Sequence, residues 1–94
     1  MRIQVTTDQL RLYLIQAIGQ DQRSEGYMHQ VGAAIWPQHR PDILTGANWG
    51  LLEWPAITVL PEECQAAIYD AVNDAKVKYS LRSTHFLGGS ATPL

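Results

Sequence analysis

Residues 61–79, PEECQAAIYDAVNDAKVKY, give the strongest structural signal in this chain. Pro61 suits the first turn of a helix, and the carboxylates of Glu62 and Glu63 lie where the positive end of the helix dipole favours them. Lys76 and Lys78 fall near the far end, where cations are favoured. The apolar positions recur at helical spacing, at Cys64, Ile68, Ala71, Val72, Ala75 and Tyr79. The stretch therefore predicts a helix over residues 61–79.

A second helix is predicted over residues 7–18. Thr6 and Gln9 have the spacing of a capping box, in which a hydroxyl and an amide each satisfy a backbone N–H. Gly19 suits the end of the helix, because glycine tolerates the left-handed conformation found there. One apolar stripe runs along the helix, made by Leu10, Tyr13, Leu14, Ala17 and Ile18. We expect this helix and helix 61–79 to form the central pair of the fold.

The rest of the chain gives weaker patterns. Tyr27, Val31 and Ile35 recur at helical spacing, which predicts a third helix over residues 25–36 that ends before Pro37. Pro41 could begin a further short helix. Short strands are predicted from alternation or β-branched content at residues 3–5, 56–60 and 84–87.

These elements predict a small, mainly α domain of three helices. An irregular segment rich in Trp and Pro, residues 37–55, would cover the helices, and pairing of one or two short strands would make the fold α+β instead. We expect one globular domain over residues 1–87 and a flexible tail over residues 88–94, since the tail is rich in Gly and Ser.

Composition argues against several classes of function. The chain has 94 residues, a net charge of −2 and only 17% charged residues, and its cations are mostly scattered. Nucleic-acid binding, which depends on gathered cations, is not expected. Membrane spanning is not expected either, because no apolar run approaches the roughly 20 residues that it needs. The N-terminus lacks the apolar run of a secretory signal, and with a single cysteine we expect a cytoplasmic protein.

No residue pattern indicates catalysis or metal binding. Cys64 lies on the apolar seam of its helix, so we expect a core residue rather than a nucleophile. His29, His39 and His85 lack the paired spacing of zinc ligands. The sequence therefore predicts no catalytic residue, no metal and no cofactor, although it does not decide whether the chain is an enzyme.

The concentration of tryptophan is the most unusual feature of the sequence. Trp36, Trp49 and Trp54 fall within nineteen residues, with Arg40 among them. Trp and Arg are enriched at the energetic centres of protein interfaces, although large indoles also pin irregular segments to a core. We expect Trp49, flanked by Asn48 and Gly50, to be the exposed one.

These features predict a non-enzymatic protein–protein interaction module, an adaptor, inhibitor or other regulator. Its partner-binding residues would be Trp49, Trp54, Arg40 and Trp36. The partner would be another protein or a second copy of the chain in a homodimer. Two alternatives stay open: a small helix-turn-helix DNA-binding regulator drawn from residues 7–52, and a small enzyme without a recognisable motif.

Overall fold

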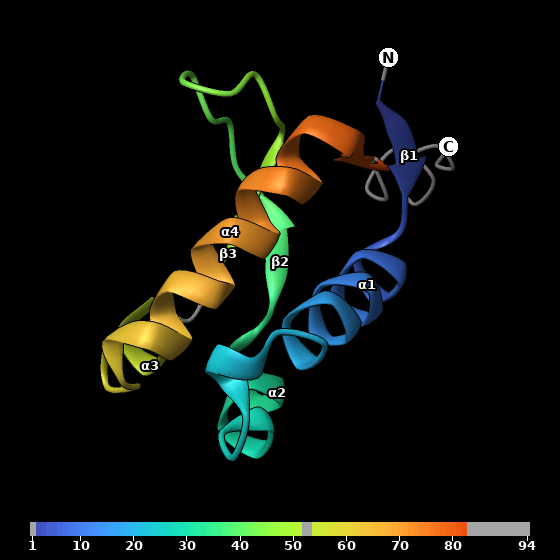
Figure 1. The fold of residues 1–94 in the computed structure, drawn as a ribbon. Helices are drawn as coiled ribbons and strands as arrows, with labels where there is room; N and C mark the ends of the chain where they lie inside the picture. Colours follow the sequence, from blue (N-terminus) through green and yellow to red (C-terminus); the bar gives the residue numbers. More distant parts are fainter. Residues whose placement is uncertain (1, 52–53, 83–94) are drawn as a thin grey trace.

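The computed structural model describes residues 2–51 and 54–82, which form helices and short strands (Figure 1). In chain order the elements are β1 (Ile3–Val5), α1 (Thr7–Gly19), the 3₁₀ turn η1 (Gln22–Ser24), α2 (Met28–Ala34), β2 (Pro37–His39), β3 (Trp49–Leu51), α3 (Trp54–Thr58), α4 (Glu62–Lys78) and β4 (Tyr79–Leu81). β1 pairs with β4 in parallel, and β2 pairs with β3 in antiparallel. The fold is therefore mainly α with minor strands, as predicted.

The two best-predicted helices are confirmed. The capping box of α1 is complete, since the Gln9 N–H donates to Thr6 Oγ1 at 3.1 Å and the Thr6 N–H donates to Gln9 Oε1 at 2.9 Å. α4 begins after Pro61 and ends at Lys78, where the chain passes directly into β4. α1 and α4 pack against each other and supply much of the core. Their buried side chains are Leu10, Leu14, Ile18, Cys64, Ala67, Ile68, Val72 and Ala75.

The third helix is shorter than predicted. α2 spans only Met28–Ala34, because Gly26 has a φ of 89° and Ile35 is already extended. Residues 25–26 form a turn instead. In η1, just before them, the buried Ser24 hydroxyl donates to the Ile18 carbonyl at 2.6 Å, which ties this polar stretch to the end of α1.

Two further predictions are wrong. Residues 56–60 were expected to form a strand, but α3 covers Trp54–Thr58, with Pro55 in its first turn and the Thr58 hydroxyl bonded to the Pro55 carbonyl at 2.8 Å. The short helix from Pro41 is also absent, because residues 41–48 form the turn between β2 and β3. The predicted strand at 84–87, the tail at 88–94 and the end of the predicted domain lie outside the described residues.

Trp49 is fully buried, so the expectation that it is exposed is wrong. Its indole Nε1–H donates to the Tyr79 carbonyl at 3.1 Å. The neighbouring Asn48 pairs with Leu81 twice, since its Oδ1 accepts from the Leu81 N–H at 2.8 Å and its Nδ2 donates to the Leu81 carbonyl at 2.9 Å. A buried indole needs a partner for its N–H, and the edge of β4 supplies one.

These side chains join the two sheets. β4 uses one edge to pair with β1, and it offers its other edge to Asn48 and Trp49 on the hairpin. His39 Nε2 lies 3.0 Å from the Arg82 carbonyl oxygen and donates to it, because a carbonyl can only accept. The β2–β3 hairpin is therefore fixed at its base. Among the described residues, no helix is long and apolar enough to cross a membrane.

The burial of Trp49 predicts its role in stability. Trp49→Ala should lower the free energy of unfolding by about 3–5 kcal/mol, because it opens a core cavity and leaves the Tyr79 carbonyl without its donor. Urea unfolding followed by circular dichroism measures this. Trp36→Ala is the matched control, and we expect it to cost about 1 kcal/mol because that side chain is 42% exposed. Equal losses for the two variants would contradict the burial of Trp49.

Candidate functional site

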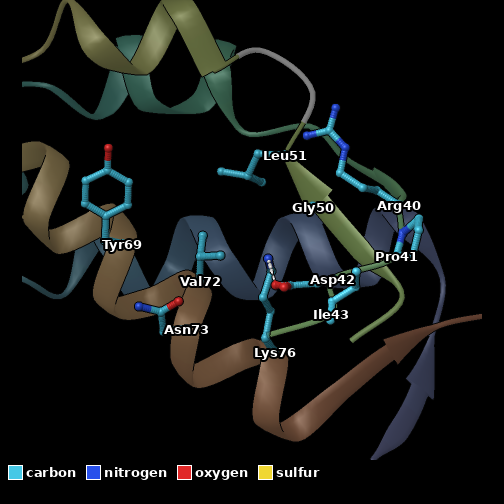
Figure 2. Close-up of a pocket in the computed structure, with 10 residues that line it drawn as sticks. All are labelled: Arg40, Pro41, Asp42, Ile43, Gly50, Leu51, Tyr69, Val72, Asn73 and Lys76. Atoms are coloured by element: carbon cyan, nitrogen blue, oxygen red, sulfur yellow. Dashed lines mark hydrogen bonds and ion pairs between the residues drawn. The ribbon is translucent and has the colours of Figure 1, made fainter. Parts of the chain in front are cut away.

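A groove of about 520 Å³ lies between the hairpin and α4 (Figure 2). One side is formed by Arg40, Pro41, Asp42, Ile43, Gly50 and Leu51, and the other by Tyr69, Val72, Asn73 and Lys76 of α4. Tyr69 stands at one end, Ile43 stands at the other, and Val72 lies between them (Figure 2). The volume falls within the range of ligand-binding clefts, roughly 300–1,000 Å³.

The hairpin turn, residues 41–48, is held by its own hydrogen bonds. The Asp42 N–H donates to the Ala47 carbonyl at 2.9 Å, and the Gly46 N–H donates to the Asp42 carbonyl at 2.7 Å. The Asp42 carboxylate also accepts from the Leu44 N–H at 3.1 Å. Gly46 has a φ of 78°, which glycine adopts without strain. The conformation of the turn is therefore held by hydrogen bonds within the turn itself.

Two basic residues tie this turn to α4. Lys76 Nζ lies 2.6 Å from Asp42 Oδ2, and both side chains are largely buried. Arg2 donates from Nε to the Lys76 carbonyl and from Nη2 to the Thr45 carbonyl, each at 2.6 Å. The hydrogen bond from Lys76, with a smaller one from Thr45, lowers the pKa of Asp42 from 3.8 to about 2. The acid is thus ionised and paired at neutral pH.

Ile43 and Leu44 form the tip of the turn and are each 96% exposed. Contiguous exposed apolar surface is a feature of protein interaction sites. The hydrogen bonds around Asp42 prevent the tip from folding back onto the core. The molecule therefore presents two aliphatic side chains from a fixed backbone, beside an open groove.

Arg40 supplies the free positive charge of the groove. Its stem crosses Gly50, where an added Cβ would lie only 3.2 Å from Arg40 Cδ. Its guanidinium makes no ion pair or hydrogen bond with the described side chains, whereas Lys76 is neutralised by Asp42. The absence of a side chain at Gly50 thus lets Arg40 lie along the hairpin beside the groove.

The structure separates the residues that were predicted to act together. Arg40 lines the groove, but Trp49 lies beneath the surface, and Trp54 begins α3 with a side chain outside the described part. Trp36 lies before β2, at the end away from the turn. There its indole donates to the Ala33 carbonyl at 2.9 Å, and the Arg11 guanidinium stacks over it at 4.2 Å.

Sequence reasoning missed the aliphatic tip and Tyr69. A usable signal was present, since Ile43 and Leu44 stand between Pro41-Asp42 and Gly46, which are typical turn residues. Apolar residues inside such a turn have no route to the core. Tyr69 gave no comparable signal, because a partly exposed tyrosine on a helix is common on protein surfaces.

The described residues offer little for catalysis. They include no group of three or more His, Cys, Asp or Glu that could hold a metal ion. Cys64 is fully buried as predicted, and burial, with a smaller effect of the Asp21 charge, raises the pKa of its thiol. A thiol with a raised pKa is a poor nucleophile at neutral pH.

The Asp42–Lys76 pair predicts a pH-dependent contribution to stability. The pKa of Asp42 is about 2 in the folded state and near 3.9 in an unfolded chain. The stabilisation is therefore complete above about pH 4–5 and is lost as the pH falls through about 2. The difference in free energy of unfolding between the wild type and Asp42→Asn should narrow over that window in urea titrations.

Lys76→Gln provides the control for this measurement. In that background, the effect of Asp42→Asn should depend on pH much less, because the largest cause of the lowered pKa of Asp42 is gone and only the smaller effect of Thr45 remains. A gap between the wild type and Asp42→Asn that stays constant with pH would show that Lys76 does not hold the carboxylate.

Comparison with known proteins gives no family for this fold and groove. No protein-family model, no curated protein and no solved structure matches the chain. What the chain does must therefore be inferred from its own surface.

Proposed function

We propose that this chain is a non-enzymatic protein–protein interaction module that binds its partner through the hairpin turn and the groove beside it. The observation that carries the proposal is the exposure of Ile43 and Leu44, 96% each, on a turn fixed by hydrogen bonds and an ion pair. The partner is another protein, with a second copy of the chain as the alternative.

The energetics favour binding at this tip. Covering an aliphatic side chain of this size contributes about 1.5–3 kcal/mol. Because the backbone of the turn is already fixed, little conformational entropy remains to be lost on binding. The tip offers a convex contact and the groove a concave one, so a partner could engage both at once.

Of the residues predicted to bind a partner, Arg40 and Trp36 keep that proposed role. Arg40 lines the groove, and Trp36 presents a half-exposed indole held by Arg11. Trp36 belongs to a separate surface, away from the turn. Trp49 is removed from the proposed contact residues, because a fully buried side chain cannot touch a partner in this conformation.

The alternative functions receive no specific support. A helix-turn-helix needs a recognition helix, and residues 37–51 form β2, a turn and β3. For the enzyme alternative, the described residues offer no activated nucleophile. The buried thiol of Cys64 is compatible with a reducing compartment, and we propose a cytoplasmic location and a regulatory role on that basis and on the small size of the domain.

Replacing the tip tests the proposed function. The double variant Ile43→Ser, Leu44→Ser should fold with unchanged stability, within about 0.5 kcal/mol, because both side chains are in water. It should lose the proteins that the wild type captures from native lysate, or its self-association in light scattering if the partner is a second copy.

Val59→Ser with Val77→Ser is the matched control. These side chains are also aliphatic and exposed, at 82% and 68%, but they lie outside the turn and the groove. The control should retain the same captured proteins as the wild type. Identical capture by the tip variant, the control and the wild type would rule out the turn as the binding surface.

A further inference from the structure

The groove combines apolar walls with one cation, Arg40, that has no ion-pair partner among the described side chains. This combination specifies a ligand. We propose that the groove binds a peptide segment of the partner in which a carboxylate stands next to an apolar side chain. The carboxylate would pair with Arg40, and the apolar side chain would lie in the middle of the groove, against the floor made by Leu51 and Val72. This inference rests on the proposed function and deepens it.

The cations of the groove differ in whether another group of the protein already pairs with them. Two cations line the groove, Arg40 and Lys76. Lys76 is held by Asp42 at 2.6 Å and also lies 5.6 Å from the Trp49 ring, so its charge is already used within the protein. Arg40 has no such partner among the described side chains. We therefore expect an anionic group of a ligand to pair with Arg40 rather than with Lys76.

The position of the guanidinium is set by the hairpin. Gly50 is buried in β3, and the stem of Arg40 passes directly over it. The stem thus lies along the strand rather than extending freely into water, and this reduces the conformational freedom that binding would remove. A guanidinium held in this way matches a carboxylate with two parallel hydrogen bonds.

The surroundings favour a peptide over a nucleic acid. A phosphate backbone needs several cations in a row, and of the two cations in the groove Lys76 is already paired with Asp42. Apart from the Asp42–Lys76 ion pair, whose charges neutralise each other, the remaining lining is aliphatic, aromatic or amide, including Val72 and Asn73. A peptide with a carboxylate beside an apolar side chain fits both parts of the lining. The carboxylate neutralises Arg40, and the apolar side chain covers the apolar surface.

Selection of random 12-residue peptides displayed on phage, with the full chain immobilised, tests the proposal. The enriched peptides should carry Asp or Glu next to an apolar residue. Replacing that acid by its amide in a synthetic enriched peptide should weaken binding by about tenfold, as a charge-assisted hydrogen bond predicts. The same replacement should have no effect with the Arg40→Gln protein, which assigns the acid to Arg40.

Two further variants separate position from net charge. Lys78→Gln removes one positive charge from α4 outside the groove and should bind the peptide as the wild type does. Gly50→Ala keeps every charge but displaces the Arg40 stem, because the new Cβ would lie 3.2 Å from Arg40 Cδ. It should weaken binding several-fold while the protein stays folded.

The possible failures are distinguishable. Enriched peptides that bind the wild type but not the Ile43→Ser, Leu44→Ser variant, yet show no acidic preference, would overturn the assignment to Arg40 and leave the proposed function standing. Tighter binding of a single-stranded 20-nucleotide DNA than of any peptide would overturn the peptide assignment. If no peptide were enriched on the wild type over the tip variant, the peptide proposal would fail, and the capture experiment alone would decide the proposed function.

Discussion

The side-chain pairing of the hairpin with β4 is the constraint on which the rest of the structure depends. Within residues 2–51 and 54–82 each sheet has two strands, and an isolated pair of that size is marginally stable in water. Asn48 and Trp49 bond to the free edge of β4 through their side chains, so that β4 is satisfied on both edges. The indole also fills the core between the helices, which makes one residue responsible for both packing and sheet connection.

Because the base of the hairpin is fixed, the position and exposure of its turn, residues 41–48, are fixed as well. Because β3 begins with the buried Trp49, the turn before it must leave the core, and Lys76 and Arg2 hold it against the end of α4. The groove is the space left between these two attachments. Ile43 and Leu44 are exposed for the same reason, since the chain that carries them is held on both sides and has no path inward.

The sequence predicted those parts of the fold that local patterns specify. Helical spacing and caps located α1 and α4, because the capping residues and apolar stripe act within a few residues of one another. The β2–β3 hairpin could not be foreseen, because Pro37-Gln38-His39 has no strand pattern and its pairing is set by contacts with distant β4. Arg40, predicted to bind a partner, lines the groove, and its binding role stays a prediction. Trp49 was wrongly expected to be exposed, because its hydrogen bond to the Tyr79 carbonyl joins residues far apart in the sequence.

Most of the few basic residues in the chain are already paired within the protein. Of the seven basic residues, five already hold carboxylates or carbonyls of the chain itself: Arg2, Arg11, Arg23, Lys76 and Lys78. Only Arg40 and Arg82 make no side-chain pair with a described residue, and of these two Arg40 lines the groove. With so few free cations among the described residues, long-range attraction of an acidic partner would contribute little under the proposed function. Under that proposal, selectivity comes from shape and apolar contact at the tip and groove, and the charge of Arg40 sets the direction of the bound segment.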